Sequence, residues 1–150
     1  LISGSDKTLW RRKALVLGWG RIGSILAQRL RALGADVYAA ARKSRDRAMA
    51  RAMGCHGLGF DELEGRIADF DYIINTIPVR VLSDAALCCV RDDALLLELA
   101  SQPGGFDRNL AENIGIRTIY APGLPGKCAP YGAAELMREA IYDVLNEQGE

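Results

Sequence analysis

The chain has 150 residues, a length that fits one domain able to bury roughly 70% of its unfolded surface. Apolar residues make up 49% and charged residues 25%, which is the balance of an ordinary globular domain. Lys plus Arg and Asp plus Glu are equal at 19 each, so the composition gives no sign of a nucleic-acid-binding protein.

Hydropathy and cysteine usage exclude two further classes. No apolar run approaches the roughly 20 residues that span a bilayer, and no signal-peptide pattern is present. Cys55, Cys88, Cys89 and Cys128 form no C-x-x-C pair, and His56 is the only histidine. We therefore expect no membrane association, no metal site, and reduced thiols, as in a cytoplasmic protein.

Apolar runs and helical periodicities alternate in chain order. Residues 13–17 (KALVL) predict a buried parallel strand, and apolar residues at helical spacing follow from Ile22 until Gly34 ends the helix. The further predicted strands cover residues 36–40, 55–60, 71–78, 94–100 and 116–121. The further predicted helices cover 44–53, 81–90, 107–114 and 132–148, and 61–69 is a polar helical turn.

This alternation predicts the fold class. Right-handed crossovers between the predicted strands give a parallel sheet with helices on both faces. We expect an α/β, doubly wound, three-layer domain over residues 13–148, with six strands in the order 3-2-1-4-5-6. Because the chain begins with Leu1 and soon enters its first strand, residues 1–12 are expected to be a linker or helix from an upstream domain.

The first strand leads directly into LGWGRIG, in which Gly18, Gly20 and Gly23 have the spacing G-x-G-x-x-G. In a dinucleotide-binding loop these glycines allow the tight turn, the approach of the pyrophosphate, and close helix–strand packing. The amides around Arg21 and Ile22 then point at the phosphates from the helix N-terminus. The alternative is a turn without a ligand, but the position between an apolar strand and a helix favours a Rossmann-type cofactor site.

The end of the second strand indicates which cofactor is bound. An NAD site usually has Asp or Glu there, whereas here the position falls near Ala41, followed by Arg42, Lys43 and Ser44. Arg pairs with a 2′-phosphate in a directional geometry, and a carboxylate would repel it. The sequence therefore favours NADP(H) over NAD(H). Most of the other basic residues nearby, Arg47 among them, are interpreted as a solvated helix face.

Other strand ends are expected to complete the pocket, because ligands bind outside the carboxyl ends of strands in such sheets. The candidates are Asn75, Thr76, Ile77 and Pro78 after the fourth strand, Ala100 and Ser101 after the fifth, and Pro122 and Gly123 after the sixth. The hydroxyls of Thr76 and Ser101 are candidates for bonds to a ribose or carboxamide. Capping of strands and helices is the alternative role for both.

Three segments go beyond a generic Rossmann pattern: DYIINTIP, LELASQPGGFD and YAPGLPGKCAP. Together with LGWGRIG and AAARKS, and over essentially the whole chain, they resemble the C-terminal, NADP-binding half of the A subunit of dipicolinate synthase. A-S-x-P-G-G and A-P-G-L-P-G-K are the most specific strings. Looser similarity extends to the cofactor domains of D-2-hydroxyacid dehydrogenases and adenosylhomocysteinases, which usually carry an acid at the position of Ala41.

The resemblance implies an NADP-dependent oxidoreductase that oxidises a dihydrodipicolinate-type ring to dipicolinate during bacterial spore formation. It also implies a small dicarboxylate substrate and a second, flavoprotein-like subunit. Lys127 is a candidate carboxylate contact, with a solvated loop lysine as the alternative. A backbone nest formed by Pro103, Gly104 and Gly105 is a second candidate. The sequence departs from the family pattern at Phe106, Tyr131 and Gly132, which bears on the substrate contacts.

No catalytic residue is identified, because His56 falls far from the predicted strand tips. We expect any acid or base to lie upstream or in the partner subunit, so that this chain alone binds cofactor without turnover. The alternatives are an NADP-sensing or scaffold module and a D-2-hydroxyacid dehydrogenase domain, for which Arg80 is the candidate arginine. The apolar face of the last predicted helix fits the sheet, an absent domain or a second copy, so self-association stays open.

Overall fold

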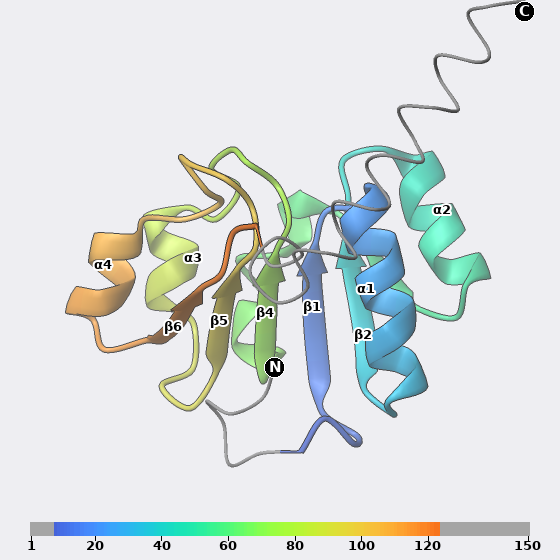
Figure 1. Ribbon diagram of the computed structural model, residues 1–150, viewed down its shortest axis with the longest axis horizontal. Helices are drawn as coiled ribbons and strands as arrows, with labels where there is room; N and C mark the ends of the chain where they lie inside the picture. Colours follow the sequence, from blue (N-terminus) through green and yellow to red (C-terminus); the bar gives the residue numbers. More distant parts are fainter. Residues whose placement is uncertain (1–7, 124–150) are drawn as a thin grey trace, which may run out of the picture.

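The computed structural model describes residues 8–123, which form one six-stranded parallel sheet flanked by helices (Figure 1). The strands are β1 (Lys13–Leu17), β2 (Asp36–Ala40), β3 (His56–Leu58), β4 (Tyr72–Asn75), β5 (Leu95–Glu98) and β6 (Arg117–Tyr120). Their order is β3-β2-β1-β4-β5-β6, which confirms the predicted doubly wound topology. Because β1 pairs with both β2 and β4, the switch point of the sheet lies between β1 and β4.

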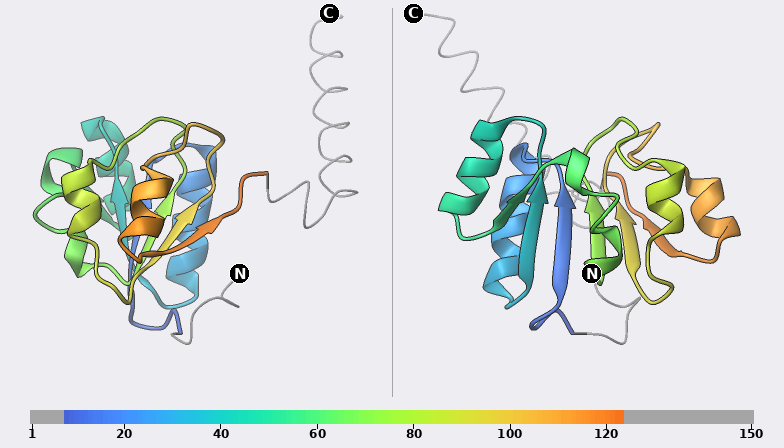
Figure 2. Two further views of the ribbon diagram at one scale, coloured as in Figure 1. Left: turned by 90° about the vertical axis from the view of Figure 1, so that its left-hand side faces the viewer. Right: turned by 180° about the vertical axis from the view of Figure 1, so that it is seen from behind.

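The helices are α1 (Arg21–Ala32), α2 (Ser44–Ala52), α3 (Asp84–Cys88) and α4 (Arg108–Asn113). Two short 3-10 turns, η1 (Phe60–Glu62) and η2 (Ile67–Asp69), connect β3 to β4. Figure 2 shows the sheet edge-on, with α1 on one side and α3 and α4 on the other. This arrangement follows from right-handed crossovers that reverse direction at the switch point.

The core has two halves, one on each face of the sheet. On β1, Ala14 and Val16 belong to the half that contains α1 and α2, whereas Leu15 and Leu17 belong to the opposite half. All four side chains are completely buried, as expected for a central parallel strand whose successive residues face opposite sides. The β3–β4 connection covers the second half with Phe70, which is also fully buried.

Several predicted boundaries are wrong at their ends. The fourth strand stops at Asn75 instead of Pro78, because the Asn75 side chain bonds the Ile77 amide and turns the chain. The third helix begins at Asp84 rather than at Val81, after the N-cap Ser83, whose hydroxyl accepts from the Ala86 amide. The third strand is shorter than predicted, and the polar turn consists of η1 and η2. The predicted helix 132–148 and residues 1–7 of the predicted linker lie outside the described residues.

The thiols in residues 8–123 are unpaired, with Cys55 buried and both Cys88 and Cys89 exposed. Desolvation raises the pKa of the Cys55 thiol, and the charge of Arg31 opposes that rise. Within these residues no group of three His, Cys, Asp or Glu side chains is placed to hold a metal ion. None of the helices in this part of the chain is long and apolar enough to cross a bilayer.

Truncation of Phe70 tests the half of the core that the β3–β4 connection covers. Phe70→Ala is expected to lower the free energy of unfolding by about 3–5 kcal/mol, since it removes a fully buried aromatic side chain and leaves a cavity. Met49→Ala, at a 44% exposed position on α2, is the control and should cost less than about 0.5 kcal/mol. Urea unfolding followed by circular dichroism measures both, and equal costs would contradict this packing.

Candidate cofactor-binding site

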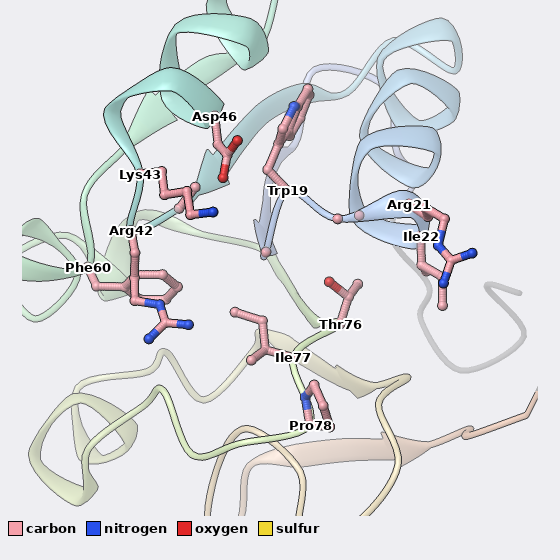
Figure 3. A pocket seen from close by; sticks show the side chains of 14 residues that line it. Trp19, Arg21, Ile22, Arg42, Lys43, Asp46, Phe60, Thr76, Ile77 and Pro78 are labelled. Atoms are coloured by element: carbon pink, nitrogen blue, oxygen red, sulfur yellow. The ribbon is translucent and has the colours of Figure 1, made fainter.

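A cavity of about 380 Å³ opens at the carboxyl edge of the sheet, around the switch point between β1 and β4 (Figure 3). The predicted site residues that line it are Gly18, Gly20, Arg21, Ile22, Gly23, Arg42, Lys43, Thr76, Ile77 and Pro78. Trp19, Ala41, Asp46 and Phe60 line it as well. The structure therefore brings together the glycine loop, the end of β2 and the end of β4, as the sequence predicts.

The glycine loop is shaped by very close backbone packing. A Cβ atom on Gly23 would lie 2.2 Å from the Gly18 carbonyl oxygen, so only glycine allows α1 to start this near β1. Gly18 has a φ of +105°, a conformation that L side chains rarely adopt. The Thr76 hydroxyl lies against both glycines, 2.7 Å and 3.1 Å from where their Cβ atoms would be, and donates to the Leu17 carbonyl at 2.8 Å. Any cofactor contact of this hydroxyl would therefore use its acceptor capacity.

Gly20 differs from the other two glycines because it faces open space. No atom lies within 4 Å of the position that its Cβ would take. Gly20 is the N-cap of α1 and supplies no side-chain acceptor, and the first turn of α1 contains no acidic residue. The start of α1 thus offers backbone amides and a favourable dipole to an anion. These features fit the pyrophosphate of a dinucleotide.

The β2–α2 connection forms another wall, and its backbone is held by a side chain that the sequence interpretation misassigned. Arg47, expected on a solvated face, donates from Nη1 to the carbonyls of Ala41 at 2.9 Å and Arg42 at 2.7 Å. Arg47 therefore fixes the backbone that carries Arg42 and Lys43. Ser44 begins α2 and is exposed, but it does not line the cavity.

Asp46 is a site residue that the sequence prediction missed. Figure 3 shows Asp46 and Lys43 on the same side of the cavity, across from Ile77 and Pro78. The prediction considered only the end of β2, whereas Asp46 reaches the cavity from the first turn of α2. Its place in the first turn of a helix that follows β2 was the feature of the sequence from which this contact could have been predicted. One acidic and two basic side chains thus face the cavity from this connection.

Asn75 and Ala100 were predicted as cofactor contacts, but neither lines the cavity. Asn75 is fully buried, and its amide nitrogen donates to the Ile77 carbonyl at 2.8 Å and to Glu98 at 2.7 Å. Ala100 is buried as well, and its backbone amide donates to Glu98 at 2.9 Å. Direct contact with a cofactor is therefore excluded for the Asn75 side chain in this conformation. The sequence prediction did not single out Glu98. The available sign of its buried role was that it is the only charged residue within the apolar run LLLELA.

The predicted nest of backbone amides at Gly104 and Gly105 is wrong. The Gly104 amide donates to the Ser101 carbonyl at 3.1 Å, and the Gly105 amide donates to Glu98 at 2.8 Å. Both donors are used within the protein, so they do not form an open cradle for a carboxylate. Pro103 lines a smaller neighbouring cavity of about 130 Å³ together with Glu98 and Tyr120.

The remaining predicted residues lie near the same edge of the sheet or outside the described part. Ser101, Pro122 and Gly123 follow β5 and β6 but do not line the larger cavity, so their contact with a cofactor stays a prediction. Phe106, a departure from the family pattern, is buried in the core. Lys127, Tyr131 and Gly132 lie outside the described residues.

His56 lies away from the carboxyl ends of the strands, as expected, at the amino end of the outermost strand β3. It is the first residue of β3, pairs in register with Tyr38, and bonds Asp36 at 3.0 Å. Its ring stacks on Tyr38 with centroids 4.4 Å apart. These contacts give the histidine a structural setting away from the cavity.

The parallel sheet, the glycine loop and the cavity at the switch point define a Rossmann-type domain that binds a nicotinamide cofactor for an oxidoreductase. The chain belongs to the family described as D-isomer specific 2-hydroxyacid dehydrogenase, NAD binding domain, whose pattern matches residues 3–98. This match bears out the looser similarity to the cofactor domains of D-2-hydroxyacid dehydrogenases.

The more specific resemblance is also confirmed. The chain is 39% identical over 146 residues to the A subunit of dipicolinate synthase from Bacillus subtilis (strain 168), a match that covers 97% of this chain and 49% of that protein. The crystal structure of the Bacillus subtilis protein superimposes with a TM-score of 0.92 over the same shares of the two chains. The corresponding structure from Bacillus halodurans, at 35% identity, gives 0.91 and covers 96% of this chain and 50% of that one. The chain thus spans about half the length of these relatives.

Two glycine substitutions separate folding from ligand binding. Gly20→Ala is expected to leave the free energy of unfolding within about 0.5 kcal/mol, because its Cβ meets no atom, while weakening cofactor binding more than tenfold by blocking the pyrophosphate. Gly23→Ala is expected to lower both stability and affinity, because its Cβ would collide with the Gly18 carbonyl.

Thermal unfolding and calorimetric titration with NADPH and NADH measure the two effects. Retention of full affinity by Gly20→Ala would contradict the placement of the pyrophosphate at the start of α1.

Proposed function

We propose that this chain is the cofactor-binding domain of an NADP-dependent oxidoreductase of the dipicolinate synthase type. The observation that carries the proposal is the 39% identity to the Bacillus subtilis protein over 97% of this chain. The SQPGG and GLPGK segments of this sequence lie outside the match to the 2-hydroxyacid dehydrogenase family, which ends at residue 98. The proposed reaction is oxidation of a dihydrodipicolinate-type ring to dipicolinate in the cytoplasm of a spore-forming bacterium. The proposed domain covers residues 13–148 and works with other parts of the enzyme.

In this proposal NADP, when bound, supplies the hydride acceptor, and the residues of this chain bind and orient it. The start of α1 and the glycine loop hold the pyrophosphate, with Gly20 leaving room for its approach. Arg42 and Lys43 hold the 2′-phosphate, and Arg47 keeps their backbone in place. Ile77 and Pro78 form the wall on the other side of the cavity.

The preference for NADP follows from the charges at the β2–α2 connection. Two cationic side chains, Arg42 and Lys43, and one carboxylate, Asp46, line this part of the cavity. The net charge of these three side chains is positive and favours a phosphate. Asp46 opposes that preference, because a carboxylate accepts from a ribose hydroxyl and repels a 2′-phosphate. We infer that Arg42 dominates and that Asp46 limits how far NADP is preferred.

The proposed partners are a small dicarboxylate substrate and a second, flavoprotein-like subunit. The name of the Bacillus subtilis relative marks it as one subunit of several, which supports a multi-subunit assembly for that protein. Lys127 stays the proposed carboxylate contact, while the 103–105 segment contributes its shape rather than free amides. The acid or base is proposed to come from outside this chain.

An assay of the full protein with its second subunit, dihydrodipicolinate and NADP tests the reaction. We expect NADPH and dipicolinate to form together, and no NADPH to form when a 2-hydroxy acid replaces the ring substrate. Binding of NADPH without turnover in the complete assembly would favour a sensing or scaffold module. Oxidation of the 2-hydroxy acid would favour a D-2-hydroxyacid dehydrogenase.

Cofactor choice is tested separately by charge substitutions in the β2–α2 connection. Arg42→Ala is expected to lower the ratio of NADPH to NADH affinity about tenfold, since it removes a charge-assisted hydrogen bond of about 1.5–3 kcal/mol. Asp46→Asn is expected to raise the ratio severalfold. Arg45→Ala, an exposed neighbour that does not line the cavity, is the matched control and should leave it unchanged. Titration of each variant with both cofactors measures the ratios, and an unchanged ratio in Arg42→Ala would overturn the NADP assignment.

A further inference from the structure

Two buried polar side chains end the neighbouring strands β4 and β5. Asn75 and Glu98 are partners in the parallel register, with exposures of 0% and 3%. The Asn75 amide donates to Glu98 Oε1 at 2.7 Å and to the Ile77 carbonyl at 2.8 Å, and its own oxygen accepts from the Ile77 amide at 3.1 Å. Asn75 thus fixes the turn that follows β4.

Glu98 fixes the loop that follows β5. Its Oε1 also accepts from the Ala100 amide at 2.9 Å, and its Oε2 accepts from the Gly105 amide at 2.8 Å. A Cβ on Gly105 would lie 2.4 Å from Asn75 Cγ, so the loop closes directly onto the pair. The Gly105 carbonyl in turn accepts from the amides of Val81 and Leu82, which joins the two loops.

Three donors therefore converge on one buried carboxylate. Burial of a carboxylate costs several kcal/mol unless hydrogen bonds replace its hydration, and these three bonds do so. A glutamine at this position would have one acceptor oxygen and would turn its NH₂ group toward at least one of the three donors. The arrangement requires a carboxylate, and an apolar pair would leave the same backbone amides without acceptors.

The two loops held in this way lie at the ligand-binding edge of the sheet. Ile77, which Asn75 bonds through both backbone groups, lines the cavity beside Pro78 and opposite Asp46 and Trp19 (Figure 3). The glycine loop and the β2–α2 connection supply the contacts for the pyrophosphate and the adenosine end. The part of the dinucleotide that these contacts do not account for is the nicotinamide half, and Ile77 and Pro78 form the part of the cavity wall that remains for it.

We propose that Asn75 and Glu98 are positioning residues that hold this wall and the 100–106 loop against the nicotinamide half of the bound cofactor. Neither residue touches the cofactor, and both act through the backbone of the loops. The proposal rests on nicotinamide dinucleotide binding and is independent of the preference for NADP and of the ring substrate.

Glu98→Gln in the full chain tests the proposal with two ligands that differ only in the nicotinamide. NADPH affinity is expected to fall about tenfold, equivalent to ~1.4 kcal/mol, whereas the affinity for 2′-phospho-ADP-ribose stays within about twofold. The fluorescence of the nicotinamide in bound NADPH should also shift toward that of the free cofactor. Asn75→Ser is a milder variant that leaves Glu98 its two backbone donors, and we expect the same selective loss.

Asp71→Asn is the matched control. Asp71 is a buried carboxylate at the amino end of the sheet, where it accepts from the Lys13 amide at 3.1 Å and pairs with Arg12 and Arg91. Its substitution should lower Tm while leaving both affinities and the fluorescence unchanged.

A parallel loss of both affinities in Glu98→Gln and Asn75→Ser would show a merely structural role and overturn the proposal. Unchanged NADPH affinity and fluorescence in both variants would overturn it as well. If the unsubstituted chain bound neither NADPH nor NADH, the proposed function itself would fail, an outcome distinct from loss of selectivity in the variants. Tighter NADH than NADPH binding would remove only the NADP assignment, and the same comparison would then use NADH and ADP-ribose.

Discussion

The start of α1 lies so close to the end of β1 that the Gly18 carbonyl occupies the space where any side chain at position 23 would begin. This contact determines where the helix axis passes the sheet, and hence where the first amides of α1 point. Thr76, from the neighbouring strand end, fills the remaining space beside both glycines and bonds the Leu17 carbonyl. The central wall of the cavity is therefore made by backbone packing, which leaves little freedom for substitution.

The flanking walls are held by a different means. On one side Arg47 bonds two carbonyls of the β2–α2 connection, and on the other Asn75 and Glu98 bond the backbone of the loops after β4 and β5. At the β2–α2 connection and at Ile77, a side chain that does not line the cavity fixes backbone next to side chains that do. Loops with few backbone partners of their own gain defined positions in this way.

The strand order and the glycine loop could be predicted because their signals are local: apolar runs, glycine spacing and helical periodicity. The wrong or missing assignments involve contacts between distant segments. From the sequence, Arg47 has the character of a solvated helix residue. Its role becomes visible only when α2 packs beside the end of β2. From the sequence, the Gly105 amide is expected to be free to bind a ligand. In the structure it donates to the buried carboxylate of Glu98, seven residues earlier. Asp46 reaches the cavity only because α2 starts beside it, which spacing alone does not reveal.

Arg47 bonds Ala41 and Arg42 only through their main-chain carbonyls. These hydrogen bonds therefore do not involve the side chains at positions 41 and 42. The shape of the connection and its charge are thus encoded by different residues. At the exposed position 42, a different side chain would leave the backbone carbonyl that Arg47 bonds in place. A change of charge at position 42 therefore need not alter the backbone path of the connection that carries it.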